Sequence, residues 1–468
     1  MTDPRRPNLL FILSDDQGPW ALGCAGNDEI HTPHLDQLAA SGVRLSRFFA
    51  ASPVCSPARA SLLTGQIPSR HGVHDWISSH EPDFLEGQRL YTDDLADAGY
   101  RLGLVGKWHL GANDRPRPGF VTWYAHESGG GPYYGATVHT DGERRTVPGY
   151  LTDDLADRAV EFLDREAANE APFALSLHFT APHTPWKGQH PREVEALYDS
   201  CAFASCPQEP AHPWQQVKPD GSPVGGEADT RAALVGYFAA VTAMDAAVGR
   251  VLARLDELGL TESTLVVFSS DNGFNCGHHG IWGKGNGTFP QNMYDSSVMV
   301  PAIVSQPGRI PGGRVCDTLL SAYDMRATLL EHLGVPYDDP GGPGRSFADL
   351  LAGASRSGGE VVVFDEYGPV RMIRTDAWKY VHRYPFGPHE LYDLAADPGE
   401  RDNLAGTGLA VEGELRGRLS GWFLRHADPH VDGSRLPVYG AGQHSLASLD
   451  AFTGLLTAGS PAPPALPC

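Results

Sequence analysis

Residues 8–18 read NLLFILSDDQG, in which an unbroken apolar run ends in two aspartates. A short run without polar alternation predicts a strand that is buried on both faces, as in a parallel sheet covered by helices. Arg5 and Arg6 precede the run and superficially suggest a secretion signal. The run is too short for a signal and has no small-residue cleavage site, so we predict a first buried strand and a cytoplasmic protein.

Four similar apolar runs follow and alternate with amphipathic segments. They are RLGLVG (101–106), FALSLHF (173–179), TLVVFSS (264–270) and PAIVS (301–305). Several of the intervening segments begin with Thr or Ser and close with Gly, as helices often do. The alternation predicts an α/β fold in which helices sandwich a large, mostly parallel sheet.

The pattern changes after Gly358. Residues 360–384, EVVVFDEYGPVRMIRTDAWKYVHRY, predict successive strands joined by short turns, and a helical segment follows over about 411–426. We therefore predict a catalytic domain over 1–355 and a smaller C-terminal α+β domain with an antiparallel sheet over 356–468. The Gly- and Pro-rich stretches 111–149 and 207–228 are expected to be long loops that help to build a site.

Composition excludes several classes of partner. The 468 residues carry a formal net charge of -21, which argues against a nucleic-acid-binding surface. No stretch was expected to approach the ~20 apolar residues of a membrane span. The seven cysteines are an odd number without regular spacing, which does not describe a disulfide framework. An anionic substrate would be repelled by the bulk protein and would need local positive charge at its site.

Two apolar runs end in clustered oxygen-bearing side chains. NLLFIL leads into Asp15 and Asp16, and TLVVFSS leads into Asp271 and Asn272. Ligands of an open parallel sheet bind beyond the carboxyl ends of its strands, so the two pairs are expected at one edge. Carboxylate and amide oxygens suit Ca²⁺ or Mg²⁺ better than Zn²⁺. The alternative is that these side chains only cap turns or helices.

Basic and imidazole side chains follow strands in the same way. Lys107 and His109 follow directly after the run RLGLVG, and residues two apart in an extended chain point the same way. His183 lies just past the run FALSLHF, and Lys284 lies in a Gly-rich loop after the run TLVVFSS. Taken singly, a loop lysine is usually solvated and a loop histidine usually makes an ordinary hydrogen bond, so only the set indicates catalysis.

The stretch SPVCSPARASLLTGQ (52–66) identifies what the set resembles. Cys55, Pro57 and Arg59 match the Cys-x-Pro-x-Arg motif of the sulfatase family, within the alkaline-phosphatase-like superfamily. The resemblance covers nearly the whole chain in the expected order, through LFILSDDQG, GKWHLG, APHTPW, SSDNG, GIWGKG and ELYDLAADPGERDNL.

The resemblance implies a covalent modification. In this family the motif cysteine, here Cys55, is oxidised to formylglycine by a maturation enzyme, and Pro57 and Arg59 belong to the signal which that enzyme reads. The hydrated aldehyde carries two hydroxyls: one attacks sulfur, and loss of the proton from the other expels sulfate. A bland alternative for Cys55 is a small buried thiol.

The resemblance also assigns roles to the other residues. Arg59 and Lys107 would stabilise the hydrate and the sulfate oxygens, and His109 would be the base for the second hydroxyl. His183 and Lys284 would grip sulfate and protonate the leaving oxygen, with the main acid between them left open. The divalent ion, Ca²⁺ with Mg²⁺ or Mn²⁺ as alternatives, would be held by Asp15, Asp16, residue 55, Asp271 and Asn272.

The substrate expected from this resemblance is a sulfate monoester of a carbohydrate, and an aryl or alkyl sulfate is the less favoured alternative. Aromatic and histidine side chains near the motifs suit a sugar ring, although loop packing explains them equally well. The candidates for substrate binding are Trp123, Tyr133, Trp186, His278 and Trp282.

Three other activities stay open at this point. A formylglycine-dependent hydrolase of phosphonate monoesters or phosphodiesters would share the same residues. A zinc phosphatase of the superfamily would need a histidine ligand in place of Asn272. A non-enzymatic binding protein would keep Cys55 unmodified.

Overall fold

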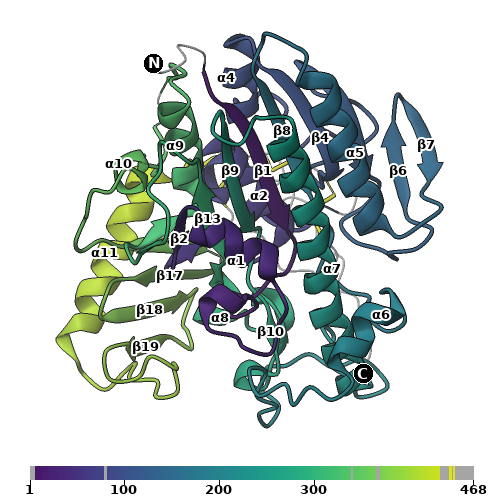
Figure 1. Ribbon diagram of the computed structural model, residues 1–468. Coiled ribbons are helices and arrows are strands. Elements are labelled where there is room, and N and C mark those ends of the chain that lie inside the picture. The colour runs from purple at the N-terminus through teal and green to yellow at the C-terminus, as the bar shows by residue number, and fades with distance from the viewer. Residues whose placement is uncertain are drawn as a thin grey trace.

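A ten-stranded mixed sheet forms the centre of the molecule in the computed structural model, which describes residues 6–77, 82–338, 341–364, 369–432, 442–444 and 446–447 (Figure 1). In spatial order its strands are β14 (Arg314–Cys316), β2 (Val43–Leu45), β13 (Ala302–Ser305), β9 (Thr264–Ser270), β1 (Asn8–Ser14), β8 (Phe173–His178), β4 (Arg101–Lys107), β5 (Phe120–His126), β6 (Thr137–Thr140) and β7 (Glu143–Thr146).

The middle of this sheet is parallel, β14 and β2 at one end are parallel to each other, and β13, β6 and β7 introduce the antiparallel pairs. Strands β9, β1, β8, β4 and β5 run parallel to one another. β13 is antiparallel to both of its neighbours, and β6 and β7 form an antiparallel edge beyond β5. The α/β class is confirmed, and the sheet is mixed because the predicted strand at 301–305 returns against the parallel core.

Alternation along β1 explains why its sequence has no polar gap. Leu9, Phe11 and Leu13 belong to the core on one face of the sheet, and Leu10 and Ile12 belong to the core on the other. Both faces are covered by helices, with α5 and α7 lying across one of them (Figure 1). The helices are α1 (Pro33–Ala40), α2 (Cys55–Thr64), α3 (Pro68–His71), α4 (Tyr91–Asp97), α5 (Leu151–Glu166), α6 (Arg192–Glu195), α7 (Thr230–Glu257), α8 (Asp295–Val298), α9 (Met325–His332), α10 (Ala348–Leu351) and α11 (Ala410–His426).

Helix α7 corrects one expectation from composition. Among the described residues it is long and apolar enough to cross a membrane by length and composition alone, with a mean hydropathy of 1.5. However, 78% of its most apolar stretch is buried inside the protein, where it packs against the sheet and α5. The side chain of Asp229 caps its first turn by accepting a hydrogen bond from the Ala232 amide.

The C-terminal part contains the predicted antiparallel sheet, formed by β16 (Val361–Phe364), β17 (Val370–Arg374), β18 (Trp378–Arg383) and β19 (Glu390–Asp393). One face of this sheet packs on α11 and the other on the main body, so it lies beside the central sheet in Figure 1. The boundary after residue 355 stays a prediction.

The smaller elements lie mainly around the carboxyl ends of the parallel strands. They are β3 (Phe48–Phe49), β12 (Met299–Val300) and β15 (Leu320–Ser321), the pair β10 (Asn275–Cys276) and β11 (Trp282–Gly283), and the 3₁₀ turns η1 (Gly23–Ala25), η2 (Ala196–Tyr198), η3 (His278–Gly280), η4 (Gly285–Gly287) and η5 (Ala322–Asp324). The prediction of a long loop over 111–149 is wrong in part, because β5, β6 and β7 lie within this range and extend the central sheet.

Candidate active site

The parallel pairing of β1 with β9 brings four oxygen-bearing side chains together. Ser14 is opposite Ser270 in the register, so Asp15 and Asp271 leave the same edge of the sheet side by side. Asp271 Oδ1 accepts a hydrogen bond from the Asp16 amide at 3.3 Å, and Asn272 Nδ2 donates to Asp16 Oδ1 at 2.6 Å. All four side chains are buried.

This cluster fits a hard divalent cation. Asp15, Asp16, Cys55 and Asp271 each offer a ligand atom, and these atoms all lie within 4.8 Å of one another. Asn272 adds a second observation, because its Oδ1 is buried and finds no hydrogen-bond partner among the residues that the structure describes. Burial and the neighbouring Asp271 raise the pKa of Asp15, a repulsion that a bound dication would relieve. The donor set of carboxylate and amide oxygens is the one that Ca²⁺, Mg²⁺ or Mn²⁺ prefers.

Cys55 is the first residue of α2 and lies beside these acids. Its Sγ is 3.4 Å from Asp15 Oδ1 and 2.9 Å from Lys284 Nζ. Burial, together with the charge of Asp15, raises the pKa of the Cys55 thiol to about 12. An unmodified Cys55 is therefore a protonated thiol at neutral pH and a poor nucleophile.

Each basic side chain of the predicted set is paired with one of the acids. Arg59, one turn into α2, places Nε and Nη2 each 2.9 Å from Asp271 Oδ2, and its Nη1 donates to the Lys107 carbonyl at 2.9 Å. Lys107 contacts Asp15, and Lys284 Nζ is 2.6 Å from Asp16 Oδ1.

These pairs govern the charge of the acids. Burial alone would raise the pKa of Asp271, but Arg59, Lys107 and Lys284 outweigh it and hold that pKa below its usual value. Since the three cations balance the three carboxylates, the positive charge needed for an anionic substrate has to come from a bound dication.

His109 is held as a neutral imidazole with a defined tautomer. Burial and the charges of Lys107 and Arg59 lower its pKa well below the ordinary value. Its Nε2 lies 3.1 Å from the Ile77 carbonyl, which can only accept, so Nε2 carries the proton. Nδ1 is then the basic nitrogen, and it has no hydrogen-bond partner in the part of the chain that the structure describes.

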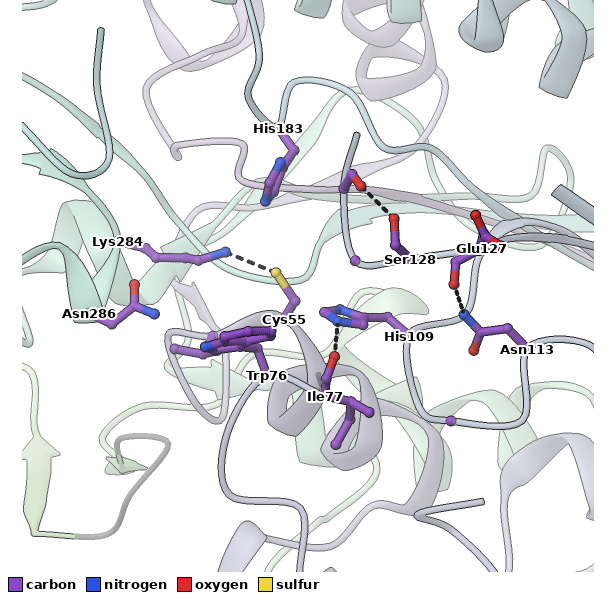
Figure 2. Close-up of a pocket in the computed structure, with 14 residues that line it drawn as sticks. Cys55, Trp76, Ile77, His109, Asn113, Glu127, Ser128, His183, Lys284 and Asn286 are labelled. Carbon is purple, nitrogen blue, oxygen red and sulfur yellow. Dashed lines mark hydrogen bonds between the residues drawn. The ribbon is translucent and has the colours of Figure 1, made fainter. Parts of the chain in front are cut away.

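His183 has the opposite arrangement of its two nitrogens. Its Nδ1 lies 2.7 Å from the Thr184 carbonyl, which leaves Nε2 free to face Asp16 Oδ2 at 3.7 Å. The side chain keeps 22% of its surface exposed, in contrast to the buried His109. In Figure 2 both imidazoles and the amine of Lys284 point toward Cys55 from three sides.

Backbone conformation at two of these positions is strained. Asp16 has a φ of 64° and His109 a φ of 59°, in the left-handed region that non-glycine residues seldom adopt. Such residues cost on the order of 1–3 kcal/mol each and cluster at functional sites. Both positions lie two residues beyond the end of a strand, β1 for Asp16 and β4 for His109.

A cavity of about 450 Å³ opens in front of Cys55. A second cavity of about 270 Å³ adjoins it, and the two share Trp76, His183, Lys284 and Asn286 in their walls. The larger one is lined by Val54, Cys55, Trp76, Ile77, His109, Gly111, Asn113, Glu127, Ser128, Gly129, Gly130, His183, Lys284 and Asn286 (Figure 2).

Four of the predicted catalytic residues line this cavity: Cys55, His109, His183 and Lys284. Arg59 and Lys107 are buried behind it in contact with the predicted metal ligands Asp271 and Asp15.

The predicted substrate-binding residues do not line the cavity. Trp186 and Trp282 pack together in an aromatic core cluster, and His278 is hydrogen-bonded to the Ser205 carbonyl. Trp123 packs against Trp108, and its Nε1 donates to the Asn113 carbonyl. Trp123 lies on β5 and Trp282 on β11, and both side chains, like that of Trp186, are buried in packing.

Tyr133 is the exception in part, since its hydroxyl donates to the His183 carbonyl at 2.8 Å and so supports that histidine from behind.

The walls that the sequence did not predict are supplied by other loops. Trp76 comes from the loop after α3, and Glu127 and Ser128 lie just after β5. Among these wall residues, Asn286 could have been found from the sequence, because it directly follows the motif GIWGKG that contains Lys284. Trp76 had none, because only the long-range packing of its loop brings it to the site.

Comparison with known proteins gives a consistent result. The family model described as Sulfatase matches residues 7–335, and the model described as N-sulphoglucosamine sulphohydrolase, C-terminal, matches residues 277–420. An N-acetylglucosamine-6-O-sulfatase of Bacteroides thetaiotaomicron is 27% identical, covering 86% of this chain and 83% of the relative. An ulvan-active sulfatase of Formosa agariphila is 31% identical, covering 86% and 78%. The crystal structure of the putative sulfatase yidJ from Bacteroides fragilis superposes with a TM-score of 0.79 at 26% identity, covering 93% of this chain and 99% of that one.

Proposed function

The chain belongs to the sulfatase family and is a sulfuric ester hydrolase, and from this premise we propose that its substrate is the sulfate monoester of a carbohydrate. The observation that carries the proposal is the convergence of Cys55, the acid cluster and two differently oriented histidines on one cavity. Two curated relatives named for saccharide substrates support the carbohydrate class.

We propose that Cys55 is converted to formylglycine and that Asp15, Asp16, Asp271, Asn272 and residue 55 hold a hard divalent ion, with Ca²⁺ favoured. When present, the aldehyde hydrate supplies a nucleophilic hydroxyl, and the ion lowers the pKa of that hydroxyl and balances the charge of sulfate. Pro57 and Arg59 are buried in α2, so a maturation enzyme that reads them has to act before the chain folds.

The chain's own side chains divide the proton transfers between them. His109 Nδ1 is the free basic nitrogen and takes a proton at residue 55 in the step that releases sulfate. His183 Nε2 and Lys284 Nζ face the other side of Cys55, where a leaving alcohol would depart. Lys284 donates from its ammonium, and His183 donates from Nε2 in the imidazolium form, because Nδ1 already carries a proton toward the Thr184 carbonyl. Lys107 and Arg59 hold the carboxylates of Asp15 and Asp271 in place.

The cavity in front of Cys55 suits a sugar. Its volume of about 450 Å³ lies in the range of small-ligand sites. Trp76 offers an aromatic face for the C–H side of a ring, and Asn113, Ser128 and Asn286 offer hydrogen-bonding groups for hydroxyls. The cytoplasmic location stays a proposal from the N-terminal sequence.

The test is a comparison of sulfate, phosphate and phosphonate esters of one sugar and one phenol on converted protein, with Cys55→Ala as the inactive control. We expect the sugar sulfate to have the highest kcat/KM. In His183→Ala, the loss on a sugar sulfate should be about 10²–10⁴-fold and much smaller on an activated aryl sulfate, whose leaving group needs little protonation. Faster turnover of the phosphonate ester would overturn the proposal, and an equal loss on both sulfates would remove His183 from the acid role.

A further inference from the structure

The loop of residues 72–77 forms one wall of the cavity and also positions His109. The Ile77 carbonyl accepts the hydrogen bond from His109 Nε2 that fixes the tautomer (Figure 2). The Ile77 amide donates to Ser56 Oγ at 3.1 Å, and that hydroxyl donates to the His109 carbonyl at 2.8 Å. A displacement of Ile77 would therefore move both the ring and the backbone of His109.

A segment from the C-terminal end of the chain holds this loop. The Gln443 amide donates to the Trp76 carbonyl at 2.8 Å, and Gln443 Oε1 accepts from the His74 amide at 2.8 Å. Gln443 Nε2 donates to the Gly72 carbonyl at 2.9 Å. One residue thus pairs three backbone groups of the loop, at alternate positions, in a parallel bridge beside Ile77.

The approach is close enough to require glycine next to Gln443. Gly442 has a φ of +78°, and a Cβ built there would lie 2.8 Å from the Trp76 carbonyl oxygen. A second part of the same end of the chain braces the start of the loop. The Asp428 amide donates to the Ser69 carbonyl at 2.8 Å, and Asp432 Oδ1 lies 2.6 Å from Arg371 Nη2 of β17.

We propose that Gln443 is a positioning residue for sulfate ester hydrolysis: it clamps residues 72–77 so that the Ile77 carbonyl meets His109 and Trp76 lines the cavity. The inference rests on the proposed function in so far as His109 acts as the base. It assigns a role to a segment beyond residues 7–335 and 277–420, the ranges that the two family models match. The clamp is effective because buried backbone groups left without partners are costly.

The test compares Gln443→Met, which keeps the side chain's length but cannot hydrogen-bond, with Gln306→Met as a matched control. Gln306 is buried and also makes two side-chain hydrogen bonds, to the Glu262 carbonyl and to His332. It follows β13 at the opposite edge of the sheet from Cys55, because β13 is antiparallel to β9.

Hydrogen exchange of the unconverted protein gives a readout that does not depend on activity. In Gln443→Met we expect amide exchange over residues 69–77 to rise at least about tenfold, the effect of losing the two side-chain hydrogen bonds to the loop, with no change in the control. In the converted enzyme, below the unfolding temperature of both variants, kcat for a sugar sulfate should fall about tenfold, because a misplaced base slows a step after binding. KM should rise as well, because Trp76 of the same loop lines the cavity.

Unchanged exchange over 69–77 in Gln443→Met would overturn the proposal. So would faster exchange with unchanged kcat, or an equal loss of kcat in Gln306→Met. If the wild-type protein hydrolyses no sulfate ester, the proposed function fails, and the positioning role of Gln443 in that reaction fails with it, while the exchange data still show whether Gln443 holds the loop. If the wild-type protein is active and Gln443→Met has the same kcat and KM as the wild type, the positioning role alone is overturned.

Discussion

At the scale of single residues, the positive and negative side chains of the site balance one another, so a bound dication would supply the net positive charge that attracts an anion. Asp15, Asp16 and Asp271 are each matched by a buried lysine or arginine. Such pairs do not attract sulfate strongly, because each cation is already engaged by a carboxylate. The residue that marks where such a cation would be held is Asn272, whose buried Oδ1 has no hydrogen-bond partner among the described residues.

Asn272→Ala should therefore separate metal binding from stability. We expect Ca²⁺ affinity to fall at least about tenfold, as for other changes around a metal site, while the metal-free protein loses only about 1 kcal/mol with the bond to Asp16. Calorimetric titration of unconverted protein and urea unfolding measure the two quantities.

Asn275→Ala is the control for the asparagine prediction. The side-chain Nδ2 of Asn275 donates to the Gly283 carbonyl and to Ser297, and its Oδ1 accepts from Ser296. This variant should therefore lose stability and keep its Ca²⁺ affinity. Equal Ca²⁺ affinity in wild type and Asn272→Ala, or stoichiometric zinc in the purified protein, would contradict the assignment of the site.

At the scale of elements, the loop after β5 is fitted to the two histidines by its glycines. A Cβ on Gly129 would lie 2.2 Å from the His109 ring, and one on Gly130 would lie 2.6 Å from the His183 ring. Distances under 3 Å force a shift of one partner, so these glycines fix how closely the loop covers the imidazoles. Gly131, next in the chain, has its nearest neighbour 3.7 Å away, in ordinary contact with His126.

Gly129→Ala should push His109 out of position, and Gly131→Ala should not. We expect kcat to fall about 10²-fold in the first variant, which corresponds to misplacing a general base, and less than about twofold in the second. Steady-state kinetics on one sugar sulfate measure both, and circular dichroism checks that each variant is folded. Equal activities of the two alanine variants would show that the loop yields instead of the histidine.

The elements also show what the sequence could predict. Asp15 and Asp271 could be placed together because strand ends of a parallel sheet share an edge, a rule that needs no knowledge of loops. The wall formed by Trp76 and the clamp formed by Gln443 could not, because each depends on pairing between segments more than 350 residues apart. Trp186 and Trp282 lie in a core cluster and do not line the cavity, because aromatic side chains near a motif serve a core as readily as a pocket.

At the scale of the whole molecule, the two sheets are joined by apolar packing and by buried charges. Val363 and Met372 of the C-terminal sheet pack in one cluster with Phe49 and Val298 of the main body. Lys379 of β18 reaches into the same seam. It is buried, and its Nζ lies 2.5 Å from Asp295 Oδ1 at the start of α8 and 2.9 Å from the Met293 carbonyl, and it contacts Glu400.

Lys379→Met should destabilise the protein as a unit, without releasing the C-terminal sheet alone. Removing Lys379 leaves the buried Glu400 without its cation and leaves Asp295 with Arg374 alone, so we expect the free energy of unfolding to fall by about 3–5 kcal/mol. The control is Arg418→Met, which removes a partly exposed pair with Glu360 and should cost less than about 1 kcal/mol. Guanidinium unfolding followed by both tryptophan fluorescence and circular dichroism should give coincident single transitions for all three proteins, since neither sheet keeps its buried face covered after the other unfolds. Two separated transitions in the wild-type protein would contradict this cooperativity and would support the predicted boundary after residue 355 as a division between independently stable domains.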